Sequence, residues 1–98
     1  MNAEQSHIAL TDFLSIAAED PRISPAHIAL YLVLHTCWIG QSCVSPIQAA
    51  KRDIMRLSKI SSNATYYRHL KDLNDSGYIK YVPVYHRYAK SLIYIRTF

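Results

Sequence analysis

The sequence is short of glycine and cysteine. Its 98 residues include two of each. Gly40 and Gly77 are too far apart to build a glycine-rich loop that binds a phosphate group. Cys37 and Cys43 form no Cys-x-x-Cys pair, and we expect both thiols to be reduced and buried rather than joined in a disulfide.

Long apolar runs are also missing. The longest covers residues 28–34, about a third of the roughly 20 residues that a membrane-spanning helix needs. Residues 1–5 are polar and lack the basic and apolar regions of a secretory signal. We therefore expect a cytoplasmic protein with no membrane contact.

Charged side chains are few but unevenly placed. They make up 18% of the chain and hydrophobic residues 50%, which indicates a buried core rather than disorder. Residues 1–45 hold one basic and four acidic side chains, a net charge of −3, whereas residues 46–98 hold ten basic and three acidic ones, a net charge of +7. A basic half of this kind is typical of a nucleic-acid binder. Seven of the eight tyrosines lie in the same half.

The sequence offers little for catalysis or metal binding. His35, Cys37 and Cys43 are close in sequence, but His35 and Cys37 are two positions apart on a predicted helix and so diverge. No nucleophile motif is present. The five histidines are scattered, and we interpret each as a surface or helix-packing residue: His7, His27, His35, His69 and His86. We expect no enzyme, no cofactor and no metal.

Two helices are expected in the acidic half. The first covers residues 4–18, with a loose apolar stripe of Ile8, Phe13, Ile16 and Ala17. The second begins at Ser24-Pro25, a serine cap followed by a first-turn proline, and runs to about Ile39. It is apolar nearly all round, which predicts a central helix buried on several sides.

A third helix is predicted from Pro46 to about Leu57, after a short connection in which Val44 can add a stub of strand. Its expected inner face is Ile47, Ala50, Ile54 and Leu57. Ile60 is the expected apolar plug of the turn that follows. A short turn joining this helix to the next predicts a helix-turn-helix.

The fourth helix, residues 62–76, is the best-marked element. Ser61 or Ser62 can cap its start, and Gly77 can end it with a left-handed conformation. Its predicted buried stripe is Tyr66, Leu70 and Leu73. The opposite side is small, aromatic and cationic, and such a face suits a DNA major groove, where Arg and Asn pair with base edges.

After Gly77 the apolar period changes from that of a helix to that of a strand. Residues 78–82 and 91–97 are rich in strand formers, and the loop between them is basic. Pro83 implies an edge or terminal position. These runs predict a β-hairpin, giving a mainly α fold with four helices and a two-stranded wing.

The chain resembles the winged helix-turn-helix domains of bacterial transcriptional regulators in its element order and in three motifs. These motifs are Ser61-Ser62-Asn63-Ala64-Thr65-Tyr66, Leu70-Lys71-Asp72-Leu73 and Ser76-Gly77-Tyr78-Ile79. The narrower pattern is similar to small regulators encoded by mobile elements. The resemblance covers residues 24–97 of a single expected domain, 1–98, to which residues 1–20 add an N-terminal helix. Such wings often carry a glycine at the tip, and this chain has none after Gly77.

The resemblance implies sequence-specific binding of double-stranded DNA. The implied groove-facing positions of the recognition helix are Ser62, Asn63, Thr65, Tyr67, Arg68 and Lys71. The implied wing contacts are His86, Arg87, Tyr88 and Lys90. Plausible phosphate contacts from the preceding helix and turn are Lys51, Arg52 and Lys59.

Other roles stay open. A winged helix can be a protein-interaction module, although such a role needs no concentration of cations. It can also be an architectural factor that bends DNA for a recombinase. We expect a homodimer, since two copies read two half-sites, with the first two helices as the dimer surface.

Overall fold

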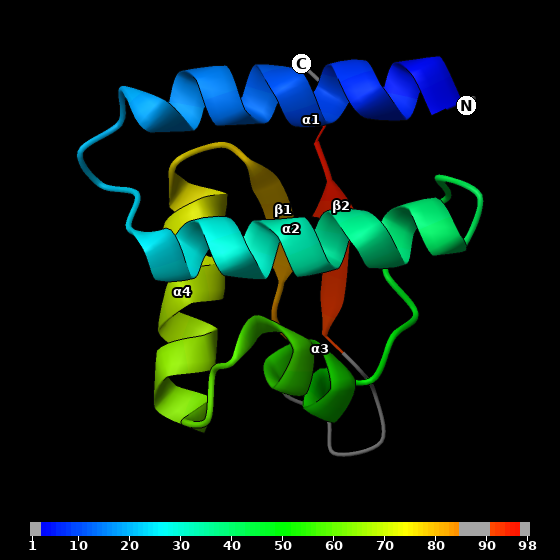
Figure 1. The fold of residues 1–98 in the computed structure, drawn as a ribbon. Helices are drawn as coiled ribbons and strands as arrows, with labels where there is room; N and C mark the ends of the chain where they lie inside the picture. Colours follow the sequence, from blue (N-terminus) through cyan, green and yellow to red (C-terminus); the bar gives the residue numbers. More distant parts are fainter. Residues whose placement is uncertain (1–2, 85–90, 97–98) are drawn as a thin grey trace.

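The computed structural model describes residues 3–84 and 91–96, with side chains from Leu10 onward. Its helices are α1 (Ala3–Ala18), α2 (Pro25–Gly40), α3 (Lys51–Ser58) and α4 (Asn63–Asp75), and the strands β1 (Ile79–Val82) and β2 (Leu92–Ile95) follow (Figure 1). The strands pair antiparallel, with Ile79 opposite Ile95 and Val82 opposite Leu92. The predicted fold class, mainly α with a hairpin in a winged-helix layout, is confirmed. No helix of the described ranges is long and apolar enough to cross a membrane.

Helix α2 lies at the centre of the fold. It contacts α1, α3, α4 and β2, and Figure 1 shows α1 antiparallel to it on one side. Ser24 caps it, because the Ser24 hydroxyl accepts the backbone N–H of His27 and the Ser24 N–H donates to His27 Nδ1 at 2.9 Å. Leu30, Tyr31 and Leu34 are fully buried. The predicted central helix is confirmed.

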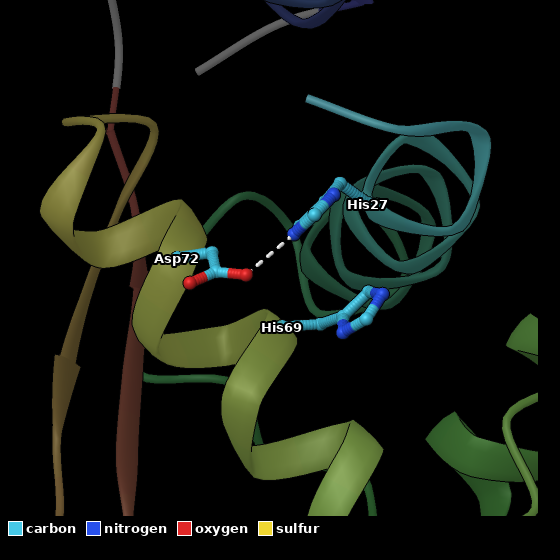
Figure 2. A group of neighbouring side chains, drawn as sticks. All are labelled: His27, His69 and Asp72. Carbon is cyan, nitrogen blue, oxygen red and sulfur yellow. Dashed lines mark hydrogen bonds and ion pairs between the residues drawn. The ribbon is translucent and has the colours of Figure 1, made fainter. Parts of the chain in front are cut away.

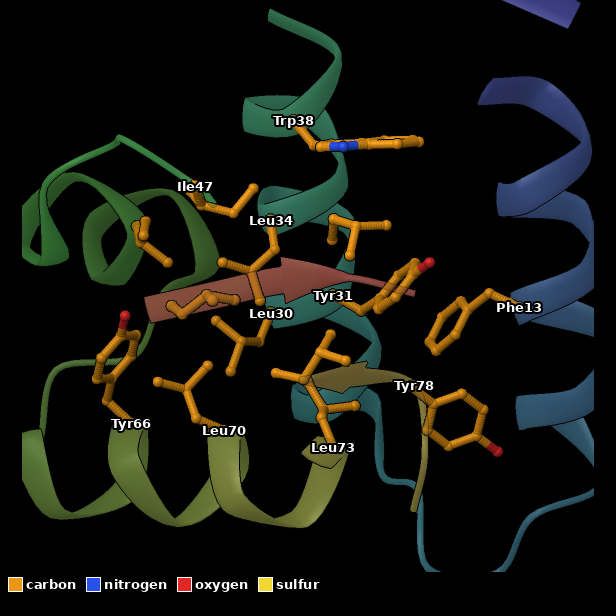
Figure 3. Close-up of a cluster of buried hydrophobic side chains, with 14 of the residues drawn as sticks. Phe13, Leu30, Tyr31, Leu34, Trp38, Ile47, Tyr66, Leu70, Leu73 and Tyr78 are labelled. Carbon is orange, nitrogen blue, oxygen red and sulfur yellow. The ribbon is translucent and has the colours of Figure 1, made fainter. Parts of the chain in front are cut away.

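Helix α1 joins the core through aromatic contacts. The Phe13 ring stacks on Tyr31 with ring centroids 3.6 Å apart and meets Tyr78 edge-on at 5.2 Å (Figure 3). Ala17 is buried one turn further along. The predicted inward position of Ile16 is wrong, since this side chain is 47% exposed. The buried stripe follows the spacing of Phe13 and Ala17, and Ile16 lies one residue, about 100°, off it.

The third helix starts five residues later than predicted. Residues 46–50 are not helical, because the Ile47 N–H donates to the Ile93 carbonyl of β2 at 2.8 Å. The inner face of α3 also differs from the prediction, with Ile54 and Ser58 buried and Leu57 53% exposed. The predicted inward position of Leu57 is wrong, and Ala50 is the residue before the helix.

The connection that precedes α3 also differs from the prediction. Val44 forms no strand and is 60% exposed. Backbone pairing to the hairpin occurs at Ile47 instead. Cys37 and Cys43 form no disulfide, as expected, but both are half-buried rather than buried.

The turn into α4 follows the prediction. Lys59 adopts a left-handed conformation (φ 63°) at the end of α3, and buried Ile60 donates its N–H to the Met55 carbonyl. Ser62 caps α4 by accepting the Thr65 N–H at 3.3 Å. The predicted stripe is buried against the rest of the core: Tyr66, Leu70 and Leu73 (Figure 3). Gly77, at φ 86°, ends the helical segment as predicted.

A polar contact joins the loop after α1 to the start of the hairpin. The Tyr78 hydroxyl donates to Asp20 Oδ2 at 2.8 Å, and the Arg22 backbone N–H and Nε donate to Asp20 Oδ1 at 2.9 Å. The Asp20 side chain is 9% exposed. The hydrogen bonds from Arg22, followed by the one from Tyr78, hold the pKa of Asp20 well below its usual range.

We expect Phe13→Ala to lower the free energy of unfolding by about 3–5 kcal/mol, because it removes a buried ring from between two aromatic neighbours. Leu57→Ala, which truncates an exposed side chain, should cost less than about 1 kcal/mol. Urea unfolding followed by circular dichroism measures both. Equal losses would contradict the described packing of α1 and the inner face of α3.

The ionisation of Asp20 should make the free energy of unfolding depend on pH. The pKa of Asp20 is lower in the folded chain than the value of about 3.9 in an unfolded one. The ionised carboxylate therefore contributes fully to the free energy of unfolding at neutral pH, and this contribution is lost as the pH falls to the unfolded pKa and below it. Asp20→Asn should therefore unfold at lower urea concentration at neutral pH and lose less stability on acidification. Glu19→Gln, an exposed neighbour with the same charge change, is the control. Parallel pH profiles for Asp20→Asn and the unaltered chain would contradict the expectation.

Candidate nucleic-acid interface

The outer face of α4 carries the predicted groove-facing residues. Of these positions Thr65 is half-buried, and the rest are exposed: Ser62, Asn63, Tyr67, Arg68 and Lys71. Ser62 also caps the helix, so its hydroxyl oxygen already accepts a hydrogen bond from the Thr65 backbone N–H. In Figure 1, α4 begins at the end of the molecule where α3 lies and ends beside the loop between α1 and α2. Its N-terminal half and α3 therefore share one end of the fold.

Helix α3 contributes to this end through Lys51. The Lys51 ammonium lies 3.3 Å from the Tyr67 hydroxyl and 5.3 Å from the centre of the Tyr67 ring. The contact places a cation of α3 beside the exposed face of α4. Arg52 and Lys59 are exposed at the two ends of α3. Lys51 thus lies beside the outer face of α4 and Lys59 lies in the turn that precedes it, while Arg52 is exposed next to Lys51 on α3.

The acidic side chains of the basic half are all engaged. Asp53 lies 3.7 Å from Arg56, Asp72 lies 2.8 Å from His27, and Asp75 lies 3.0 Å from Lys71. The hydrogen bond from Lys71 is the main cause that lowers the pKa of Asp75, and the same bond raises the pKa of Lys71. Lys71 is therefore less available for a phosphate than the sequence alone indicated.

Four cations around the start of α4 contrast with these pairs. Within residues 10–84 and 91–96 they form no ion pair with a described carboxylate: Lys51, Arg52, Lys59 and Arg68. Asp53, the acid that follows Arg52 on α3, lies 3.7 Å from Arg56 instead. An anionic ligand would find uncompensated charge there.

A cleft of about 610 Å³ lies between α4 and the hairpin. Its walls are Tyr67, Lys71, Asn74, Asp75, Tyr81, Pro83, Val84 and Ser91. Asn74 supports the wall by accepting the Tyr81 backbone N–H at 2.8 Å. The predicted wing contacts His86, Arg87, Tyr88 and Lys90 lie outside the described residues.

A side-chain group that sequence reasoning missed lies on the inner side of α4. His27 and His69 are buried and stacked, with ring centroids 4.2 Å apart, and His27 Nε2 donates to Asp72 Oδ2 (Figure 2). Burial is the largest cause that lowers the pKa of His69, and the charges of His27 and Arg68 add to it. His69 and Asp72 are one turn apart, a spacing that could have signalled the group. The partner His27 lies 45 residues from Asp72 and carries no local signal.

Comparisons of the chain with family models, curated proteins and solved structures give no match. The resemblance to winged helix-turn-helix regulators therefore rests on the residues themselves.

Proposed function

We propose that this chain binds double-stranded DNA in a sequence-specific manner and acts as a transcriptional regulator. The observation that carries the proposal is the set of exposed cations without an acidic partner among the described residues, grouped around the start of α4: Lys51, Arg52, Lys59 and Arg68. The phosphate backbone supplies the negative charge that such a surface binds. The α4 side chains would then read base edges in the major groove.

The roles within the proposed interface follow from the side chains. Arg68 is exposed on α4 and can form a bidentate pair with a guanine. Asn63 and Thr65 stand in the first turn, where they reach base edges or phosphates. Arg52 and Lys59 serve phosphates on either side. Of the acids in the C-terminal half of α4, Asp75 pairs with Lys71, which offsets its charge, and Asp72 bonds to His27 on the side of α2.

The proposal includes a homodimer. Helices α1 and α2 carry exposed large apolar side chains that a second copy of the chain could cover: Leu14 and Ile16 on α1, and Leu32 and Ile39 on α2. A two-fold pair would present two α4 helices to two half-sites. The cationic end of the fold would stay free in such a dimer.

Arg68→Ala should weaken binding to the preferred site, selected from random duplexes, by about 1–3 kcal/mol. Arg22→Ala removes the same charge from the loop after α1 and should leave this affinity nearly unchanged. Fluorescence anisotropy over a salt series measures both. The logarithm of the affinity should fall steeply with the logarithm of salt, by about 0.9 for each phosphate contacted.

Absence of binding even at low salt would contradict the DNA proposal and favour a protein-interaction role. Equal effects of Arg68→Ala and Arg22→Ala would contradict the assignment of α4 as the reading helix.

Sedimentation should give about twice the chain mass of 11.2 kDa at micromolar concentration. Ile16→Glu should shift the chain to a monomer, because it places a charge in an apolar contact. Leu57→Glu, on the exposed side of α3, should leave the dimer intact. A monomeric unaltered chain would contradict the dimer.

A further inference from the structure

Three metal-ligating side chains meet where α4 packs on the start of α2. His27 comes from the first turn of α2, and His69 and Asp72 come from one face of α4 (Figure 2). One ring nitrogen of each histidine and one carboxylate oxygen of Asp72 all lie within 4.8 Å of one another. The three residues are therefore close enough to share one ion.

His69 has an unused hydrogen-bonding atom. The residue is 7% exposed, and its Nδ1 is buried with no hydrogen-bond partner among the described residues. A buried polar atom without a partner is costly, and native structures usually satisfy it with a protein group, a water or an ion.

Asp72 gives the group a route to solvent. Its side chain is 42% exposed, whereas that of His27 is 8% exposed. An ion can therefore enter past the carboxylate, and a water can occupy a remaining coordination position. Two imidazoles and one carboxylate with an open position suit zinc, which accepts nitrogen and oxygen ligands in a tetrahedral arrangement.

We propose that His27, His69 and Asp72 form a zinc-binding site that joins α2 to α4. Bond lengths of about 2.0–2.2 Å around zinc place tetrahedral ligand atoms roughly 3.4 Å apart. The ligand atoms now lie up to 4.8 Å apart, and rotation of the side chains brings them to this spacing. The two stacked rings must tilt so that both nitrogen lone pairs point at the ion.

The proton on His27 also moves. The Ser24 N–H donates to Nδ1, so the ring proton is on Nε2, which donates to Asp72. Zinc takes the place of that proton on Nε2, and the ring binds a proton at Nδ1 instead. The Ser24 hydroxyl oxygen, 2.7 Å from Nδ1, accepts a hydrogen bond from this Nδ1–H. The ring stays neutral, and the Ser24 N–H gives up its bond to Nδ1.

Zinc binding to the untagged, full-length chain tests the site, by isothermal titration and by competition with a chromophoric chelator. We expect about one zinc ion per chain, and we expect Asp72→Asn and His69→Gln each to weaken binding at least about tenfold. His86→Gln, which removes a histidine outside the group, should bind as the unaltered chain does. Cys37→Ala/Cys43→Ala should also bind normally, which excludes the thiols as ligands.

A second measurement separates lost binding from lost folding. Zinc should raise the melting temperature of the unaltered chain, since the three ligands meet only in the folded state, and should not raise that of Asp72→Asn. The Asn side chain is nearly the same size and lies partly in solvent, so this variant is expected to fold. The proposal is overturned if the unaltered chain binds no zinc, if Asp72→Asn binds equally well, or if the cysteine or His86 variants lose binding.

Discussion

The burial of α2 is the constraint on which the rest of the structure depends. Apolar side chains cover nearly the whole of this helix, so water must be excluded from several of its sides at once. Helices α1, α3 and α4 and strand β2 each cover a part of it. The orientation of α4 follows from this packing, because its stripe of Tyr66, Leu70 and Leu73 is held in the same core. The outward direction of Arg68 is a consequence.

Local patterns in the sequence were enough to predict the elements whose ends and faces are marked nearby. Ser24-Pro25 marks the start of α2, and Ser62 and Gly77 mark the two ends of the α4 segment. Each depends on hydrogen bonds or backbone angles within a few residues, which composition and spacing reveal. The exposed cations of α3 and α4 were predicted for the same reason, since they lie opposite an apolar stripe.

Features that depend on distant residues could not be predicted. The start of α3 is displaced because Ile47 pairs with Ile93, and the residues around Ile47 do not predict this hydrogen bond. Within α3 the buried face follows Ile54 and Ser58, four residues apart, and Leu57 lies one residue off it and is exposed. The contact of His27 with Asp72 is likewise invisible to a periodicity argument. The pairing of Asp75 with Lys71 could have been read from the four-residue spacing on a helix.

The aromatic contact between α1 and the core has a consequence for the chain as a module. Phe13 lies against Tyr31 of α2 and Tyr78 at the start of the hairpin, so the N-terminal helix is an integral layer rather than an appendage. A gene fragment beginning at Ser24 would encode the helix-turn-helix and the wing but leave two tyrosine faces uncovered. If this domain were transferred to another protein, the transferred segment would therefore have to include the first helix, or another element would have to bury the rings of Tyr31 and Tyr78.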